Sequence, residues 1–251
     1  MPEEGLVAVA HGSADPRAAA AVGALVPLVA RRAEERGLSV PDLRIAYLGH
    51  ATPSVPQVMR AFGPDTQVTA LPLLLTAAYH SKTDIPRVLA SSRVPGLRVS
   101  YGGTLGPHSL LLRALERRLA EAAPAALEAP ERTAVVLAAA GSSDPEANAT
   151  VARLAAQWQA RTGWLAVRPA YASAADPTPD AAAAGLLRAG ADRVVVASYL
   201  LAPGLFADRV LRASLAAGAA AVSPVLGASA EVADVLLDRY AEAGTRQRAA
   251  A

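Results

Sequence analysis

Cysteine is absent from the 251 residues of this chain. Its absence excludes disulfide bonds, thiolate metal sites, cysteine-ligated iron–sulfur clusters and a cysteine nucleophile. Aromatic residues make up only 4% of the chain, which leaves few side chains on which nucleic-acid bases could stack. No segment approaches the ~18 uninterrupted apolar residues that a transmembrane helix needs. Any metal ion must therefore be held by histidine, carboxylate or backbone oxygen, and we expect neither a nucleic-acid nor a membrane partner.

The chain also has no large excess of charge of one sign, because its 24 Lys and Arg residues are nearly balanced by 22 Asp and Glu residues. Only Lys82 is a lysine, and no clustered basic run marks a nucleic-acid interface. Glu3 and Glu4 precede the first apolar run, where a secretory signal would carry positive charge. These features together predict a cytoplasmic protein.

Apolar residues account for 53% of the chain and charged residues for 18%, as expected of a globular protein with a large core. In the first half, short apolar runs alternate with amphipathic stretches. The predicted strands are Leu6–Ala10, Arg44–Leu48, Gln67–Leu75 and Leu97–Tyr101, and the predicted helices are Arg17–Arg36, Ser54–Phe62, Ser81–Ala90 and Pro107–Ala122. Continuous apolar strands separated by helices indicate a parallel sheet that is covered on both faces.

The second half repeats this scheme. Its predicted strands are Val135–Ala139, Ala166–Tyr171, Arg193–Leu201 and Ala220–Pro224, and its predicted helices are Pro145–Arg161, Thr178–Ala189, Ala207–Ala217 and Ala230–Ala243. The turn at residues 11–16, HGSADP, aligns with residues 140–145, AGSSDP. We therefore predict two tandem copies of one α/β domain, at residues 1–123 and 133–251, joined by a linker at residues 124–132.

Histidines gather in the loops of the first half. His11, His50 and His80 each follow one of its first three strands, whereas the second half has no histidine. In open parallel sheets, ligands bind beyond the carboxyl ends of the strands. Both halves keep the Gly-Ser-x-Asp-Pro turn and only the first keeps the imidazole. We therefore expect the turn to be structural and the imidazole functional, with the chemistry in the first domain.

Two imidazoles without cysteine form a site that suits Fe(II), Co(II), Ni(II) or Zn(II). Two protein ligands leave most coordination positions open, which suits a metal ion that is handed on. The competing interpretation is that each loop histidine is an ordinary surface or capping residue. A serine hydrolase is disfavoured because Ser13 lacks the G-x-S-x-G elbow. Nucleotide use has no support, since no P-loop lysine and no G-x-G-x-x-G motif is present.

Several segments resemble one known family. Residues 9–17, VAHGSADPR, resemble the amino-terminal motif of the sirohydrochlorin chelatases of siroheme and cobalamin biosynthesis. The segment from Leu73-Leu74-Leu75 through Tyr79-His80 to Asp84-Ile85-Pro86 is similar to that family's second motif. Ala46-Tyr47-Leu48 with Pro53-Ser54 is similar to the segment between the two motifs. Residues 200–206, LLAPGLF, resemble the degenerate copy found in the long, two-domain form of the family.

The resemblance implies two tandem flavodoxin-like domains of the class II chelatase type, facing a central cleft. It implies ATP-independent insertion of Fe²⁺ or Co²⁺, with Ni²⁺ as a further candidate, into sirohydrochlorin. His11 and His80 would then be the metal-binding and catalytic pair. Many relatives have an acidic residue where this chain has Gly49, so His50 becomes the candidate proton acceptor.

The substrate of such an enzyme is a multiply carboxylated tetrapyrrole, which needs polar or cationic partners. Ser13, Arg17, Lys82 and Arg87 lie in or beside the motif loops and are the candidates. Because both halves lie in one chain, we expect an active monomer with an internal pseudo-dimer. Two alternatives remain: a non-catalytic metal or tetrapyrrole carrier, and the chelatase scaffold recruited to another metal-dependent biosynthetic step.

Overall fold

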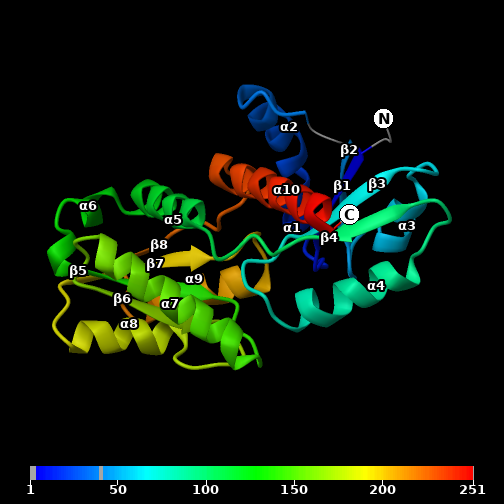
Figure 1. Ribbon diagram of the computed structural model, residues 1–251. Helices are drawn as coiled ribbons and strands as arrows, with labels where there is room; N and C mark the ends of the chain where they lie inside the picture. The colour runs from blue at the N-terminus through cyan, green and yellow to red at the C-terminus, as the bar shows by residue number, and fades with distance from the viewer. Residues whose placement is uncertain (1–3, 40–41, 251) are drawn as a thin grey trace. The chain divides into compact units, whose positions relative to one another are not determined.

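A computed structural model describes residues 4–39 and 42–250 (Figure 1). The chain divides into two compact units, one of residues 1–110 with 228–251 and the other of residues 111–227. Each unit is built on one four-stranded parallel sheet. Within the described ranges, no helix has both the length and the apolar character required to cross a membrane.

The first sheet has the strand order β2-β1-β3-β4. Its strands are β1 (Glu4–Ala10), β2 (Asp42–Tyr47), β3 (Gln67–Pro72) and β4 (Arg98–Tyr101). β1 is central and is buried at every position from Gly5 onward, which explains its uninterrupted apolar sequence. All pairings are parallel, so the carboxyl ends of the first three strands, and the loops that follow them, lie at one edge of the sheet.

Helices cover both faces of this sheet. They are α1 (Pro16–Gly23), α2 (Leu25–Glu35), α3 (Val55–Arg60), the π-helical segment η1 (His80–Asp84), α4 (Ile85–Ser91) and α10 (Ala230–Ala250). α3 and α4 pack on the face that presents Val7 and Val9 of β1. α10 contacts α2, β3 and β4, and Figure 1 shows it beside α2.

The second sheet has the equivalent order β6-β5-β7-β8. Its strands are β5 (Thr133–Ala139), β6 (Ala166–Tyr171), β7 (Arg193–Tyr199) and β8 (Ala221–Val222). Its helical segments are α5 (Ser109–Ala122), α6 (Pro124–Leu127), the 3₁₀ turn η2 (Pro130–Arg132), α7 (Pro145–Arg161), α8 (Pro179–Arg188) and α9 (Leu205–Ala216). The prediction of two tandem α/β domains with parallel sheets is confirmed.

The borders of the compact units differ from the predicted ranges 1–123 and 133–251, because the last helix of each sequence repeat belongs mostly to the compact unit of the other repeat. In α10, Asp234 accepts a 2.7 Å ion pair from Arg32 of α2. In α5, Glu116 accepts a 3.0 Å hydrogen bond from the indole N–H of Trp158 in α7. The predicted linker at residues 124–132 therefore lies inside the second unit.

One predicted helix is also divided. The stretch Arg17–Arg36 forms α1 and α2, which meet at Ala24. Gly23 weakens the helix at this point, and Pro27 lacks the N–H that a continuous helix would use. The break turns α2 toward α10, with which it shares the Arg32 ion pair. At the other end of the chain, α10 continues beyond the predicted end at Ala243.

Candidate metal site

His11 lies directly after β1, in a turn held close to the loop that follows β2. The N–H of Gly49 donates to the carbonyl oxygen of His11 at 3.2 Å. Gly12 has φ +90°, and a Cβ atom there would lie 1.7 Å from the carbonyl oxygen of Gly49. Only glycine permits this approach. The turn therefore fixes the backbone of the exposed His11 beside the Gly49–His50 loop.

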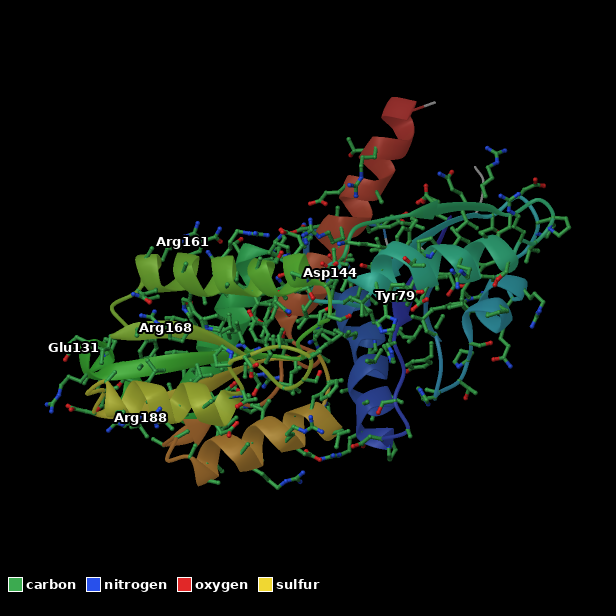
Figure 2. The ribbon with its side chains drawn as sticks, turned by 90° about the horizontal axis from the view of Figure 1, so that it is seen from below. Tyr79, Glu131, Asp144, Arg161, Arg168 and Arg188 are labelled. Atoms are coloured by element: carbon green, nitrogen blue, oxygen red, sulfur yellow. The ribbon has the colours of Figure 1, made fainter. Side chains whose placement is uncertain are left out.

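His80 opens the π-helical segment that follows β3 and Tyr79, which Figure 2 labels. Its Nδ1 lies 2.6 Å from the Oδ2 of Asp84, four residues later. The Nδ1 of His11 lies 3.1 Å from the carbonyl oxygen of Gly12. In the neutral imidazole one ring nitrogen donates and the other accepts, and both Nδ1 partners are oxygen acceptors. In that neutral form Nδ1 therefore donates in each ring, and Nε2 keeps a lone pair that is able to bind a metal ion.

The imidazoles of His11 and His80 lie together. Their ring centroids are 4.5 Å apart, with an angle of 78° between the rings. A ring nitrogen lies about 2.0–2.1 Å from a bound Zn²⁺ and similar ions, which puts each ring centroid about 3.2 Å from the metal. Two such rings whose nitrogens subtend 90° at one ion would have centroids about 4.5 Å apart, and at the tetrahedral angle about 5.2 Å apart. The spacing of His11 and His80 therefore matches that of two ligands to one metal ion.

His50 also lies near His11, with ring centroids 6.4 Å apart and rings inclined by 16°. Its backbone has φ +60°, a left-handed conformation that non-glycine residues adopt at a cost of roughly 1 kcal/mol or more. Across the ranges 4–39 and 42–250, no group of three or more His, Asp or Glu side chains is arranged to hold a metal ion. The site thus offers two imidazole ligands with a third imidazole nearby.

The second half shows the same backbone without the imidazoles. Strand register aligns Ala10 with Ala139 and Tyr47 with Tyr171. The equivalent of His11 is therefore Ala140, the equivalent of His50 is Ala174, and the equivalent of His80 is Phe206. Ala174 has φ +59°, like His50. The left-handed position thus belongs to the loop, and the three imidazoles are particular to the first half.

The predicted substrate contacts lie near the start of two helices. Ser13 accepts a 3.1 Å hydrogen bond from the N–H of Asp15, whose side chain caps α1. Arg17 pairs with Asp15 at 2.6 Å and holds the pKa of that carboxyl group below its usual value through hydrogen bonds. Lys82 and Arg87 are exposed on η1 and α4. The contacts of these side chains with a tetrapyrrole stay predictions.

The contacts of two residues at the site were not predicted from the sequence, although Asp84 lies in the second motif. Asp84 stands four residues after His80, a spacing that brings side chains together on a helix, and this was the available signal. Tyr101, at the end of β4, donates from its hydroxyl to the carbonyl oxygen of Ser81 at 2.7 Å. Burial raises the pKa of Tyr101 to about 12, so the hydroxyl keeps its proton. No sequence pattern pointed to this contact.

Comparisons with known proteins agree with the two-fold repeat. The CbiX family model matches residues 5–122 and 134–243. The sirohydrochlorin cobaltochelatase of Priestia megaterium is 32% identical over 146 residues, which are 57% of this chain and 47% of that protein. The sirohydrochlorin ferrochelatase of Bacillus subtilis is 29% identical over 180 residues, which are 70% of this chain and 67% of that protein. The chain thus spans about half to two thirds of these relatives.

Solved structures are similar over almost the whole chain. The structure of SirB from Bacillus subtilis with Fe³⁺ has a TM-score of 0.78 and 25% sequence identity, and the match covers 98% of both chains. The cobalt complex of the sirohydrochlorin chelatase SirB from Bacillus subtilis subspecies spizizenii has a TM-score of 0.74 and 24% identity, with 96% of this chain and 95% of that chain covered.

Proposed function

Because this chain belongs to the CbiX family, we propose that it inserts a divalent metal ion, Fe²⁺ or Co²⁺, into sirohydrochlorin without ATP. The observation that carries the proposal is the pairing of His11 and His80, 4.5 Å apart, beyond the carboxyl ends of two adjacent strands. The names of the cobaltochelatase and ferrochelatase relatives support the same substrate and both metals.

His11 and His80 hold the incoming metal ion through their Nε2 atoms. Two imidazoles bind a divalent ion and leave the remaining positions to water and then to the pyrrole nitrogens. An open site of this kind suits a metal that is a substrate and must leave the protein. The softness of imidazole is compatible with Fe²⁺, Co²⁺ and Ni²⁺ alike, so the ligand set does not select among these ions.

The macrocycle must lose two N–H protons as the metal enters. The charge of the ion lowers the pKa of the pyrrole N–H groups, and a nearby base accepts the protons. We assign one proton to His50, whose ring lies 6.4 Å from that of His11. The other proton goes to the imidazole of His11 or His80 once that ring has released the metal ion. Gly49 leaves open space at the position where many relatives have an acidic residue, with no atom within 4 Å of a Cβ there. His50 is the adjacent base in this chain.

The carboxylates of the substrate are recognised by cations and by polar groups at helix starts. Arg17 and Ser13 lie at the start of α1, and Lys82 and Arg87 lie on η1 and α4. Because each chain carries both repeats, the protein acts as a monomer. Sedimentation combined with an activity assay tests this, and activity found only in a dimer fraction would contradict it.

The experiment that tests the function is anaerobic incubation of the protein with sirohydrochlorin and either Fe²⁺ or Co²⁺, followed by absorption spectroscopy. A chelatase converts the spectrum of the free macrocycle into that of its metal complex faster than the same mixture without protein. A metal or tetrapyrrole carrier would bind its ligand and leave the rate at the protein-free value, and this result would overturn the proposal.

A role for His50 is tested separately in the same assay. His50→Ala is expected to lower the initial rate and to change its dependence on pH, while the affinity for Co²⁺ alone stays the same. An unchanged rate and pH profile would show that water takes the protons.

A further inference from the structure

The helix that begins with His80 has a direct counterpart in the second half. The N–H of Lys82 donates to the carbonyl oxygen of Ala78 at 3.0 Å, and that of Asp208 donates to Gly204 at 2.9 Å. These two bonds align the helix starts at a separation of 126 positions. The same separation relates Leu74 to Leu200, whose carbonyl oxygens accept equivalent 2.9 Å bonds after the strands.

The ends of the two helices align differently. Ser92 caps the C-terminus of α4, and Ala217 caps that of α9, 125 positions later. The first half therefore has one residue more between the start and the end of this helix. The extra residue coincides with the π-helical segment His80–Asp84. A π-helical turn is the form that a helix takes when it absorbs one additional residue, and such turns are frequent at functional sites.

The extra residue changes the environment of the position four residues after His80, compared with the position four residues after the equivalent Phe206. In the second half that position, counted from Phe206, is Val210, which is fully buried in the core. In the first half the buried core residue is Ile85, five positions after His80. The fourth position after His80 therefore lies outside the core. Asp84 occupies it, with its Oδ2 2.6 Å from the Nδ1 of His80.

A second contact in the first half holds the widened turn. Tyr101 donates to the carbonyl oxygen of Ser81 within η1. In the first sheet Tyr101 pairs with Ala70, and in the second sheet Val222 pairs with Val196, the equivalent of Ala70. Val222 is therefore the equivalent of Tyr101. The second half thus has an aliphatic residue where the first has a hydroxyl donor, and its helix starts as a regular α-helix.

We propose that Asp84 is a positioning residue for metal insertion: one additional residue in the helix places its carboxylate on His80 Nδ1, which fixes the ring and leaves Nε2 as the metal-binding nitrogen. Carboxylates that accept a hydrogen bond from a metal-binding imidazole typically change metal affinity or activity by about 10–100-fold when they are removed. This inference rests on the proposed role of His80.

The test uses Co²⁺ alone as the probe, titrated into the full chain, and then the insertion assay with sirohydrochlorin. Asp84→Asn and Asp84→Ala are expected to weaken Co²⁺ binding by about 10–100-fold and to lower the insertion rate. Asp84→Glu, which restores a carboxylate, is expected to recover part of both. Asp144→Asn is the matched control, because it removes the carboxylate that caps α7 in the second half, where the sequence has no histidine.

Nitrogen NMR of the imidazole side chains supplies a signal that a merely structural role would not move. In the wild-type protein, His80 is expected to be the Nδ1–H tautomer, and in Asp84→Ala a mixture of both tautomers. In a His80→Ala background, Asp84→Ala should have no further effect on Co²⁺ affinity. Wild-type affinity and an unchanged tautomer in Asp84→Ala would overturn the proposal.

The two proposals fail in different ways. If Asp84 has no positioning role while the function holds, Asp84→Asn keeps wild-type affinity for Co²⁺ and the wild-type protein still inserts metal. If the function is wrong while Asp84 positions His80, Asp84→Asn weakens Co²⁺ binding and the wild-type protein leaves sirohydrochlorin unmetallated.

Discussion

Gly12→Ala is expected to damage both stability and metal insertion, because the turn that carries His11 has no room for a side chain. The new Cβ would lie 1.7 Å from the carbonyl oxygen of Gly49, whereas carbon and oxygen atoms in contact are about 3.3 Å apart. One of the two loops must therefore move by about 1.6 Å to relieve the overlap. That movement displaces His11 from His80.

The expected loss of stability has two parts. An alanine in a left-handed conformation costs about 1–2 kcal/mol, and forcing extra volume into a packed position costs about 1–3 kcal/mol. We therefore expect Gly12→Ala to lower the free energy of unfolding by about 2–5 kcal/mol. Because a displacement of about 1 Å at a reacting group can cost ~10²-fold in rate, we also expect insertion to fall by about that factor.

The chain supplies two matched controls. Gly37 also has a left-handed backbone, with φ +64°, but has open space around it, so Gly37→Ala should carry only the conformational cost and keep full activity. Gly141 repeats the close approach in the second half, where a Cβ would lie 1.9 Å from the carbonyl oxygen of Ser173. Gly141→Ala should lose as much stability as Gly12→Ala and retain much more activity.

Urea denaturation at 25 °C measures the first quantity, and the initial rate of Co²⁺ insertion, under conditions in which every variant is folded, measures the second. Equal stability of Gly12→Ala and Gly37→Ala would refute the predicted overlap with Gly49. An equal fractional loss of activity in Gly12→Ala and Gly141→Ala would refute the predicted displacement of His11.

Two further predictions concern other residues. Burial and the nearby Arg239 lower the pKa of His108, against the opposing effects of Asp238 and Glu242. Around pH 6.5, the usual pKa of histidine, the folded protein therefore binds fewer protons at His108 than the unfolded protein does. The contribution of the neutral His108 to stability is complete above about pH 6.5 and declines as the pH falls toward the folded-state pKa. In urea denaturation, wild type should lose more stability than His108→Gln from about pH 7.5 to about pH 5, and equal losses would contradict this. Gly49→Glu should change stability by no more than about 0.5 kcal/mol, because the position is open, and should raise the insertion rate by adding a proton acceptor. An unchanged insertion rate would show that a carboxylate at position 49 does not take part in the reaction.

Much of the architecture could be predicted from the sequence, because buried parallel strands must be continuous apolar runs. The proximity of His11 and His80 followed from the same reasoning, since each comes after a strand of one parallel sheet. The exchange of α5 and α10 between the units could not be predicted. Both helices are amphipathic, and an apolar stripe shows that a helix packs on a core but not on which one.

The contact between Asp84 and His80 could not be predicted for a different reason. Its spacing from His80 is visible, but the same spacing in the second half leads from Phe206 to the buried Val210. Whether the fourth residue after His80 faces the core or the imidazole depends on the one additional residue in the first turns of that helix. Such a local change in helix geometry leaves no periodic signal in a five-residue segment.

Substitution of the paired imidazoles tests the central claim most directly. His11→Ala and His80→Ala each leave one imidazole to hold the metal ion, and both are expected to lower the initial rate of Fe²⁺ and Co²⁺ insertion by about 100-fold or more. Each should remain within about 0.5 kcal/mol of the wild-type free energy of unfolding, since neither side chain is part of the core. Phe206→Ala, at the position equivalent to His80, should keep most of the activity. Full activity in both histidine variants would contradict the account.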